Sequence, residues 1–198
     1  PEFLEIIIDK NLKCIKEILT PSNQIPLFNG GTESGLEQFD KLLNNLNYKP
    51  KKSKKIIGGI HAFNIKNTAI FFDAGEPPKK SFSMSYQSGP LSFEYYLDGN
   101  KVITNCGFGS NISSKAQLLS RLTSAQSTLT LNDTSVTKFE RNKLINRIFG
   151  NSIKNTFKIN NLDLAENKDQ IKFTASHNGY EKKFGSIHKR ELSIDKLN

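Results

Sequence analysis

The stretch PLSFEYYLDGNKVITNC, residues 90–106, decides the fold. It holds two apolar runs separated by the dipeptide Asp98-Gly99. An Asp-Gly pair between such runs is a strong hairpin signal, because both residues tolerate the positive φ angles of the tight turns that match strand twist. The stretch therefore predicts two antiparallel strands joined by a two-residue turn.

Strand signals continue on both sides of this hairpin, at spacings of about 8 to 15 residues with Gly, Asn and Asp between them. This series is typical of an antiparallel β-sandwich, so the predicted fold class is mainly β. Residues 135–153 are ambiguous and predict a long loop with a short helix. The further predicted strands are residues 54–65, 68–75, 126–132, 155–161, 170–180 and 186–194.

Two helices precede the strands. Apolar side chains recur at helical spacing over residues 3–19, and Pro21 ends this helix. Ser34 with Glu37 three residues later predicts the capped start of a second helix. The lysine-rich residues 49–55 are interpreted as a linker.

We therefore place a domain boundary in this linker. Residues 1–52 form the predicted helical segment with its linker, and residues 53–198 form the predicted β-sandwich domain. The chain begins with Pro1 and ends just after a predicted strand, so we expect a fragment whose sandwich is truncated.

The chain is basic, with 28 Lys and Arg against 19 Asp and Glu and a formal net charge of +9. Such a charge suggests a polyanionic partner. Arginine is the preferred residue for bidentate phosphate recognition, yet only four arginines are present and the lysines are dispersed. Nucleic acid is therefore an unlikely partner. No apolar run approaches the roughly 18 residues of a membrane span, so no membrane partner is expected.

Four segments, taken in order, resemble a known family. They are DAGEPP (73–78), GPLSFEYYLDGNKVITNCG (89–107), RLTSAQSTLTLND (121–133) and ASHNGYEKKFGSIHKREL (175–192). Together they resemble the C-terminal β-sandwich domain of heparinase II/III-like polysaccharide lyases. The two preceding helices look like the end of the α/α toroid of that family.

The resemblance implies β-elimination on an acidic, uronate-containing polysaccharide. A base removes the C5 proton of the uronate, a positive group neutralises its carboxylate, and the 4-linked sugar leaves. In the family the toroid supplies a Tyr and a His or Asn. The sandwich supplies a histidine-rich segment and a metal site, often zinc. Members often act in the periplasm, although the sequence also allows a cytoplasmic location.

Compared residue by residue, this chain departs from the family's metal site. Ser85 and Gln87 stand where the family has histidines, Asn105 stands for the metal-binding Asp, and Gln126 stands for the second metal-binding His. Neutral amides bind zinc poorly. We therefore expect the zinc site to be lost and no cofactor to be bound. We expect Gln87, Asn105 and Gln126 to form a hydrogen-bonded amide cluster instead.

Three other residues are site candidates. His177 and Tyr180 match a family S-H-D-G-Y stretch and are candidate catalytic residues, while a structural bond within the sheet is the alternative for His177. Arg121 matches a family arginine and is a candidate for binding a substrate carboxylate. The alternative for Arg121 is a salt bridge to Glu94 or Asp133.

The sequence leaves three functions open. The first is part of a lyase acting on a uronate-containing glycan such as a glycosaminoglycan, with this segment alone inactive. The second is a degenerate, metal-free glycan-binding or structural module of the same family, which the substitutions at the metal positions favour. The third is general polyanion or nucleic-acid binding, which charge alone suggests.

Overall fold

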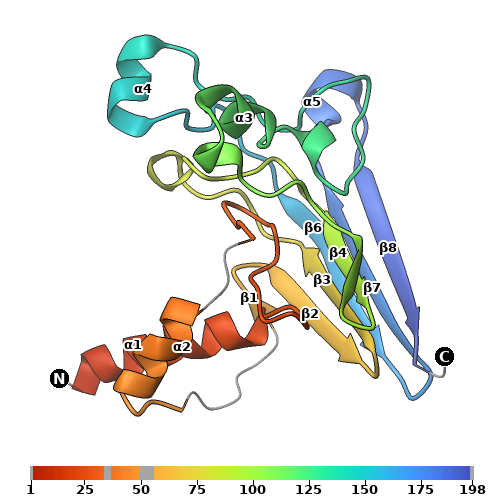
Figure 1. Cartoon of the computed structure of the whole chain (residues 1–198). Coiled ribbons are helices and arrows are strands. Elements are labelled where there is room, and N and C mark those ends of the chain that lie inside the picture. The colour runs from red at the N-terminus through yellow and green to blue at the C-terminus, as the bar shows by residue number, and fades with distance from the viewer. Residues whose placement is uncertain (1, 34–36, 50–55, 197–198) are drawn as a thin grey trace.

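The computed structural model describes residues 2–33, 37–49 and 56–196 (Figure 1). Both N-terminal helices are present, as α1 (Glu2–Glu17) and α2 (Glu37–Asn45), which confirms the two predicted helices. The predicted cap at Ser34 and linker residues 50–55 lie outside the described residues. No helix in the described ranges is long and apolar enough to cross a membrane.

The first sheet is a meander of antiparallel neighbours in chain order. The turn between its last two strands has φ angles of 50° at Asp98 and 79° at Gly99, which confirms the predicted two-residue hairpin. Its strands are β1 (Ile56–Ile57), β2 (Ile60–Ile65), β3 (Thr68–Asp73), β4 (Phe93–Leu97) and β5 (Asn100–Ile103).

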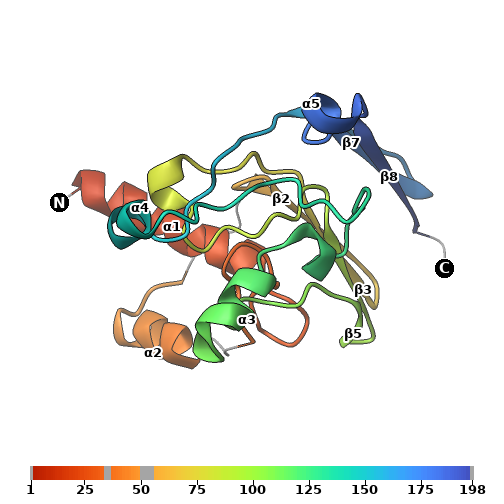
Figure 2. The ribbon, with the colours of Figure 1, turned by 90° about the horizontal axis from the view of Figure 1, so that it is seen from above.

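The second sheet contains β6 (Ile159–Glu166), β7 (Gln170–His177) and β8 (His188–Asp195), again antiparallel (Figures 1 and 2). Apolar side chains from both sheets meet in one core, in which Phe72 and Phe173 have ring centroids 4.2 Å apart. The architecture is therefore the predicted antiparallel sandwich, because each sheet buries one face against the other. The buried residues of this core are Phe63, Ile70, Phe72, Ala74, Leu91, Ile171, Phe173, Ala175 and Ile194.

The prediction of a strand at residues 126–132 is wrong, since this segment is irregular. The Ser127 hydroxyl donates to the Phe93 carbonyl and accepts from the Phe93 amide, and the Thr128 hydroxyl donates to the Pro90 carbonyl. Side-chain hydroxyls thus take the backbone partners that a ladder would use.

The short helices lie in the connections between strands. The predicted short helix within residues 135–153 is present as α4. The full set of short helices is η1 (Lys80–Phe82), η2 (Gly109–Asn111), α3 (Ser114–Leu119), η3 (Thr123–Ala125), α4 (Lys143–Phe149) and α5 (Glu181–Phe184).

The loop at residues 26–31 packs against the outer face of the first sheet, although it precedes the predicted domain boundary. Leu27 and Phe28 are buried, and Phe28 packs with Phe71 and Tyr96 on the face of the first sheet that points away from the second. The loop therefore joins the helical segment to the sandwich and brings its residues to the region where the family's site residues fall.

Candidate functional site

Two of the three amides at the family's metal positions meet at one carbonyl. Gln87 Nε2 donates to the carbonyl oxygens of Ser120 (3.0 Å) and Gly107 (2.9 Å), and its Oε1 accepts from the Gly30 amide. Gln126 Nε2 donates to the same Ser120 oxygen over 2.7 Å. Both side chains are buried. They therefore bind to backbone, sharing a carbonyl rather than bonding to each other.

Asn105 belongs to a different network, centred on the fully buried Glu94. Its Nδ2 donates to Glu94 Oε1 (3.3 Å), while its Oδ1 accepts from the Ser127 amide (2.9 Å). The expectation that the three amides bond to one another is therefore wrong. The physical reason is that nearer partners take the hydrogen bonds of each amide. The partners are backbone groups for Gln87 and Gln126, and the Glu94 carboxylate for Asn105.

These residues do not fit a zinc ion. A zinc ligand must offer a lone pair, but the Nε2 atoms of Gln87 and Gln126 are donors aimed at carbonyls, and Gln87 Oε1 is already bonded to Gly30. Within the described ranges, His, Cys, Asp and Glu side chains form no group of three that could hold a metal.

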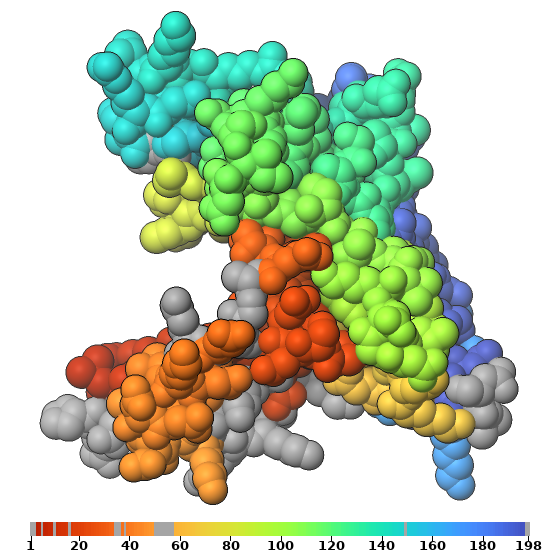
Figure 3. Space-filling view, in the orientation of Figure 1, coloured from red at the N-terminus to blue at the C-terminus, as the bar shows by residue number. Residues whose placement is uncertain are grey.

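Ser85 takes a separate place, in an open pocket of about 210 Å³ where the 26–31 loop meets the segment that follows β3. Figure 3 shows the molecule hollowed below the yellow segment around residue 80 and beside the orange loop around residue 30. The side chains that matter at this pocket are Asn29, Glu76, Phe82, Ser85 and Tyr86.

Asp73 is buried behind this pocket. It accepts from the Gly75 amide (2.9 Å) and from Asn29 Nδ2 (3.2 Å). Burial raises the pKa of Asp73 to about 6, although these two hydrogen bonds act in the opposite direction. Burial and then the charge of Asp73 raise the pKa of Tyr86 well above its ordinary value. The pocket thus has a carboxyl that titrates near neutral pH behind its wall.

Arg121 holds the loops together. Its three side-chain nitrogens donate to the carbonyls of Tyr86, Asn151 and Ser83 at 2.6–2.8 Å, and its guanidinium lies 4.1 Å from the Phe139 ring centroid. The side chain is 0% exposed. Neither sequence alternative matches this arrangement, since the guanidinium faces carbonyls rather than solvent or, within the described residues, a carboxylate.

His177 and Tyr180 lie together at the end of the second sheet. The Gly179 amide donates to His177 Nδ1 (3.1 Å), so the neutral ring carries its proton on Nε2 and donates it to His188 Nδ1 (3.0 Å). Burial, and then His188 and Arg190, lower the pKa of His177 to about 3. A general base works best with a pKa near the operating pH, so this geometry favours the structural alternative for His177.

Tyr180 connects the irregular 129–134 segment to the same sheet through hydrogen bonds. Its hydroxyl is within hydrogen-bond distance of the Leu129 carbonyl (2.9 Å) and the Thr134 carbonyl (3.2 Å), and it accepts from the Leu131 amide. The ring is 1% exposed, and burial raises the pKa of the phenol. Both candidate catalytic residues are therefore engaged in packing, away from the Ser85 pocket's lining.

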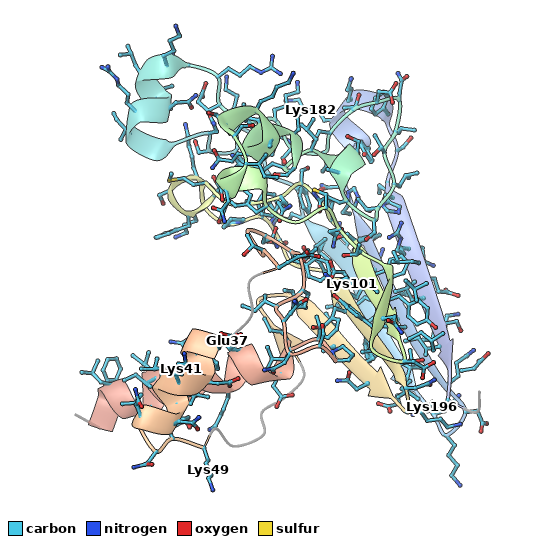
Figure 4. The ribbon with its side chains drawn as sticks, in the orientation of Figure 1. Glu37, Lys41, Lys49, Lys101, Lys182 and Lys196 are labelled. Carbon is cyan, nitrogen blue, oxygen red and sulfur yellow. The ribbon has the colours of Figure 1, made fainter. Side chains whose placement is uncertain are left out.

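The lysines are spread over the molecule. The five labelled in Figure 4 come from α2, the end of the following turn, β5, α5 and the C-terminal end of the second sheet. Lys101 pairs with Glu33 (2.5 Å), and Lys196 pairs with Glu166 (2.7 Å). The dispersal predicted from the sequence therefore persists in the fold, with part of the charge paired locally.

Comparison with known proteins decides the family. The model of the heparinase II/III-like C-terminal domain matches residues 56–198. This chain belongs to that family. No protein of curated function matches the sequence.

Solved heparinase-type structures share the fold. The heparan sulfate lyase HepC from Pedobacter heparinus superposes with a TM-score of 0.66 at 16% identity, covering 99% of this chain and 31% of that one. A mutant of that lyase gives 0.68 at 15% identity, with 98% and 31% covered. A heparinase III structure gives 0.64 at 12% identity, with 98% and 33% covered. This heparinase II/III-like chain therefore spans about a third of the length of these solved relatives.

Sequence reasoning missed two carboxyls of this family member. From the sequence alone, Glu94 is only a candidate salt-bridge partner of Arg121, and nothing assigns a role to Asp73. The available signal was an acidic residue inside or directly after an apolar strand, in LSFEYYL and AIFFDAG. Such a carboxyl must be buried with partners or face a site, and the strand pattern alone does not distinguish these outcomes.

Proposed function

We propose that this chain is the sandwich-side part of a polysaccharide lyase that cleaves an acidic, uronate-containing glycan by β-elimination. Family membership over residues 56–198 carries this proposal. It is supported by the position of Ser85, which stands at a family histidine position and lies in an open pocket beside the loop from the helical segment.

In this proposal the chain's own residues bind and orient the glycan. The Ser85 hydroxyl and the Phe82 ring are exposed at the pocket and offer a hydrogen-bonding group and an apolar face. No histidine is among the described residues that line it. We therefore assign the base to the toroid, as the family resemblance implies. The proposed reaction uses no metal ion, because the amides of Gln87, Asn105 and Gln126 do not fit one.

The test is a cleavage assay on the full-length protein with a panel of uronate polymers. β-Elimination leaves an unsaturated uronate, and the ultraviolet absorbance of this product rises in proportion to the number of bonds broken. We expect product with at least one polymer, and Ser85→Ala should reduce its rate by about threefold because one neutral hydrogen bond is lost. Absence of product with every polymer would overturn the lyase assignment.

A metal-free glycan-binding module without lyase activity is the second candidate. It is favoured because four of the candidate site residues are buried and already hydrogen-bonded within the protein, so none of them is free to act on a substrate. These residues are Gln87, Gln126, Arg121 and His177. Binding of a uronate polymer with no cleavage, measured on the same full-length protein, would support this candidate over the first. Equal, salt-sensitive binding to DNA and to a glycan would instead indicate simple polyanion affinity.

A further inference from the structure

Gln87 joins the two segments between which the Ser85 pocket opens. Asn29 lines the pocket from the 26–31 loop, and Ser85 lines it from the segment after β3. Gln87 lies in that second segment, two residues after Ser85, and is 1% exposed. Its Oε1 accepts from the Gly30 amide (3.0 Å), and its backbone amide donates to Asn29 Oδ1 (3.3 Å). Both hydrogen bonds therefore run from one wall of the pocket to the other.

The other end of the same side chain is fixed in the sandwich. Gln87 Nε2 donates one hydrogen bond to the Gly107 carbonyl and one to the Ser120 carbonyl. The two N–H groups and the carbonyl oxygen are thus all used, so the amide is held in one orientation. One buried side chain therefore connects the 26–31 loop with two further segments of the sandwich through hydrogen bonds.

The two walls of the pocket approach each other closely. A Cβ added to Gly30 would lie 2.9 Å from Ser85 Cβ, which is closer than side chains can approach without a shift. Gly30 also has a φ angle of 100°, which favours glycine. The absence of a side chain at this position lets the loop backbone come within reach of Gln87 Oε1.

The 26–31 loop has other attachments at both of its ends. The Leu27 amide donates to Glu94 Oε1 (3.1 Å). The Phe108 amide donates to the Gly31 carbonyl (3.0 Å). Loss of the Gln87 side-chain bonds should therefore loosen the wall of the pocket without detaching the whole loop.

We propose that Gln87 is a positioning residue of the proposed glycan site: its amide holds the 26–31 loop against the Ser85 segment, so that the pocket is ordered before the glycan binds. The inference rests on the proposed function and deepens it. Gln87 is buried and does not touch the glycan. It acts through its neighbours, because a wall that is fixed in advance loses no conformational entropy when the glycan binds.

The experiment compares Gln87→Met with Gln126→Met in the full-length protein. Methionine is unbranched like glutamine, but it cannot donate to the carbonyls and accepts only weakly. Gln126 is the matched control, because it is also buried and donates to the same Ser120 carbonyl. Among the described residues, its side chain bonds to Ser120, Leu122 and Cys106, all outside the loop.

The first measurement is the Kd of a tetrasaccharide, determined by calorimetry. The probe is a tetrasaccharide of the uronate polymer that the full-length protein binds most tightly. We expect its Kd to rise about tenfold in Gln87→Met, because binding must then order the wall of the pocket, and by less than about twofold in Gln126→Met.

Gly30→Ala disturbs the same contact from the loop side. The added methyl group would press on Ser85 Cβ, while Gln87 keeps both of its bonds to the sandwich. We expect a rise in Kd of about tenfold here as well. Because the loss falls on binding, KM should rise with Kd in both variants, while kcat should change by less than about twofold. This variant decides the question if Gln87→Met does not fold.

Hydrogen exchange of the backbone amides gives a second readout, which needs no glycan. The Gly30 amide loses its acceptor in Gln87→Met, so we expect it to exchange at least about tenfold faster than in the wild type or in Gln126→Met. Unchanged exchange would show that Gln87 does not hold the loop. Faster exchange with an unchanged Kd would show that the bond is only structural, and either result overturns the proposal.

These outcomes separate the role of Gln87 from the lyase assignment. The expected rise in Kd without any cleavage product upholds the positioning role and overturns the lyase assignment. Cleavage by the wild type together with an unchanged KM in Gln87→Met does the reverse. A wild-type protein that binds none of the polymers overturns the glycan function, and the positioning role with it. A cooperative thermal unfolding transition confirms that each variant is folded.

Discussion

Two buried polar networks, one in each sheet, are built around different ionisable groups. In the first sheet, Glu94 Oε1 accepts from Leu27 N, Thr104 Oγ1 and both nitrogens of Asn105, and Oε2 accepts from the Tyr96 hydroxyl at 2.7 Å. In the second sheet, His177 and His188 share one hydrogen bond. Five donors surround the carboxylate, whereas a bond between two imidazoles requires at least one of them to be neutral. The comparison teaches that each buried ionisable group depends on the hydrogen-bond partners that the fold places around it.

The largest effect is expected from breaking the carboxylate network. Glu94→Leu leaves the buried amides of Leu27 and Asn105 without acceptors. Since orphaned buried donors each cost about 1–3 kcal/mol, we expect the free energy of unfolding to fall by about 4 kcal/mol, measured by urea denaturation.

Glu94→Gln is the matched control for charge. It keeps the shape and one acceptor oxygen but turns the other end into a donor, which faces the Tyr96 hydroxyl or the backbone amides. We expect it to lose about half as much stability as Glu94→Leu. If Glu94→Leu cost less than about 1 kcal/mol, the network would not be structural.

Acidification should break the histidine network next. Burial, then His188 and Arg190, lower the pKa of His177 to about 3, and burial, then Arg190, lower that of His188 to about 4. In the unfolded chain, each of these histidines has a pKa of about 6.5. The contribution of each histidine to the free energy of unfolding is therefore complete above pH 6.5 and declines by about 3 kcal/mol as the pH falls from 6.5 to 4.

A single substitution tests this origin. His188→Gln keeps an acceptor for the His177 Nε2 proton and removes one titrating ring. We expect the loss of unfolding free energy between pH 6.5 and 4 to shrink by roughly half, measured by urea denaturation at each pH. An acid dependence identical to that of the wild type would show that other groups cause it.

Asp73 should give a smaller effect with the opposite sign. Burial raises its pKa to about 6 in the fold, against about 3.9 in an unfolded chain. The folded state therefore holds this proton more tightly, and the contribution to stability is complete below pH 4 and lost as the pH rises through 6, by about 3 kcal/mol.

Asp73→Asn should remove the pH-dependent contribution of Asp73 to the free energy of unfolding. The acid loss between pH 6 and 4 would then be steeper than in the wild type, because the histidine contribution is no longer offset. A variant whose stability curve keeps the wild-type slope in this window would contradict the assignment to Asp73. The Glu76→Gln variant supplies a control, since it removes an exposed carboxylate at the same pocket.

The sequence predicted those parts of the fold that depend on local chemistry. Asp98-Gly99 specified its turn because few residues accept two consecutive positive φ angles. The strand prediction for residues 126–132 is wrong because the alternation of polar and apolar residues does not show that the Ser127 and Thr128 hydroxyls bind the neighbouring backbone. In the site, the metal positions were located by resemblance, but their partners depend on contacts between distant loops, such as Gly30 with Gln87. Periodicity carries no information on such contacts.

The smallest expected effect is that of zinc. Because Gln87 and Gln126 aim donors at Ser120 O and Asn105 lies in the Glu94 network, we expect saturating zinc to shift the thermal midpoint of the full-length protein by less than about 1 °C, compared with a chelator-treated sample. The triple variant Gln87→His, Asn105→Asp, Gln126→His restores the family's ligand types and tests placement separately from chemistry. A stabilisation by zinc in this variant alone would show that the amides caused the loss of the metal. Stoichiometric zinc at the wild-type residues would contradict the geometry of both glutamines.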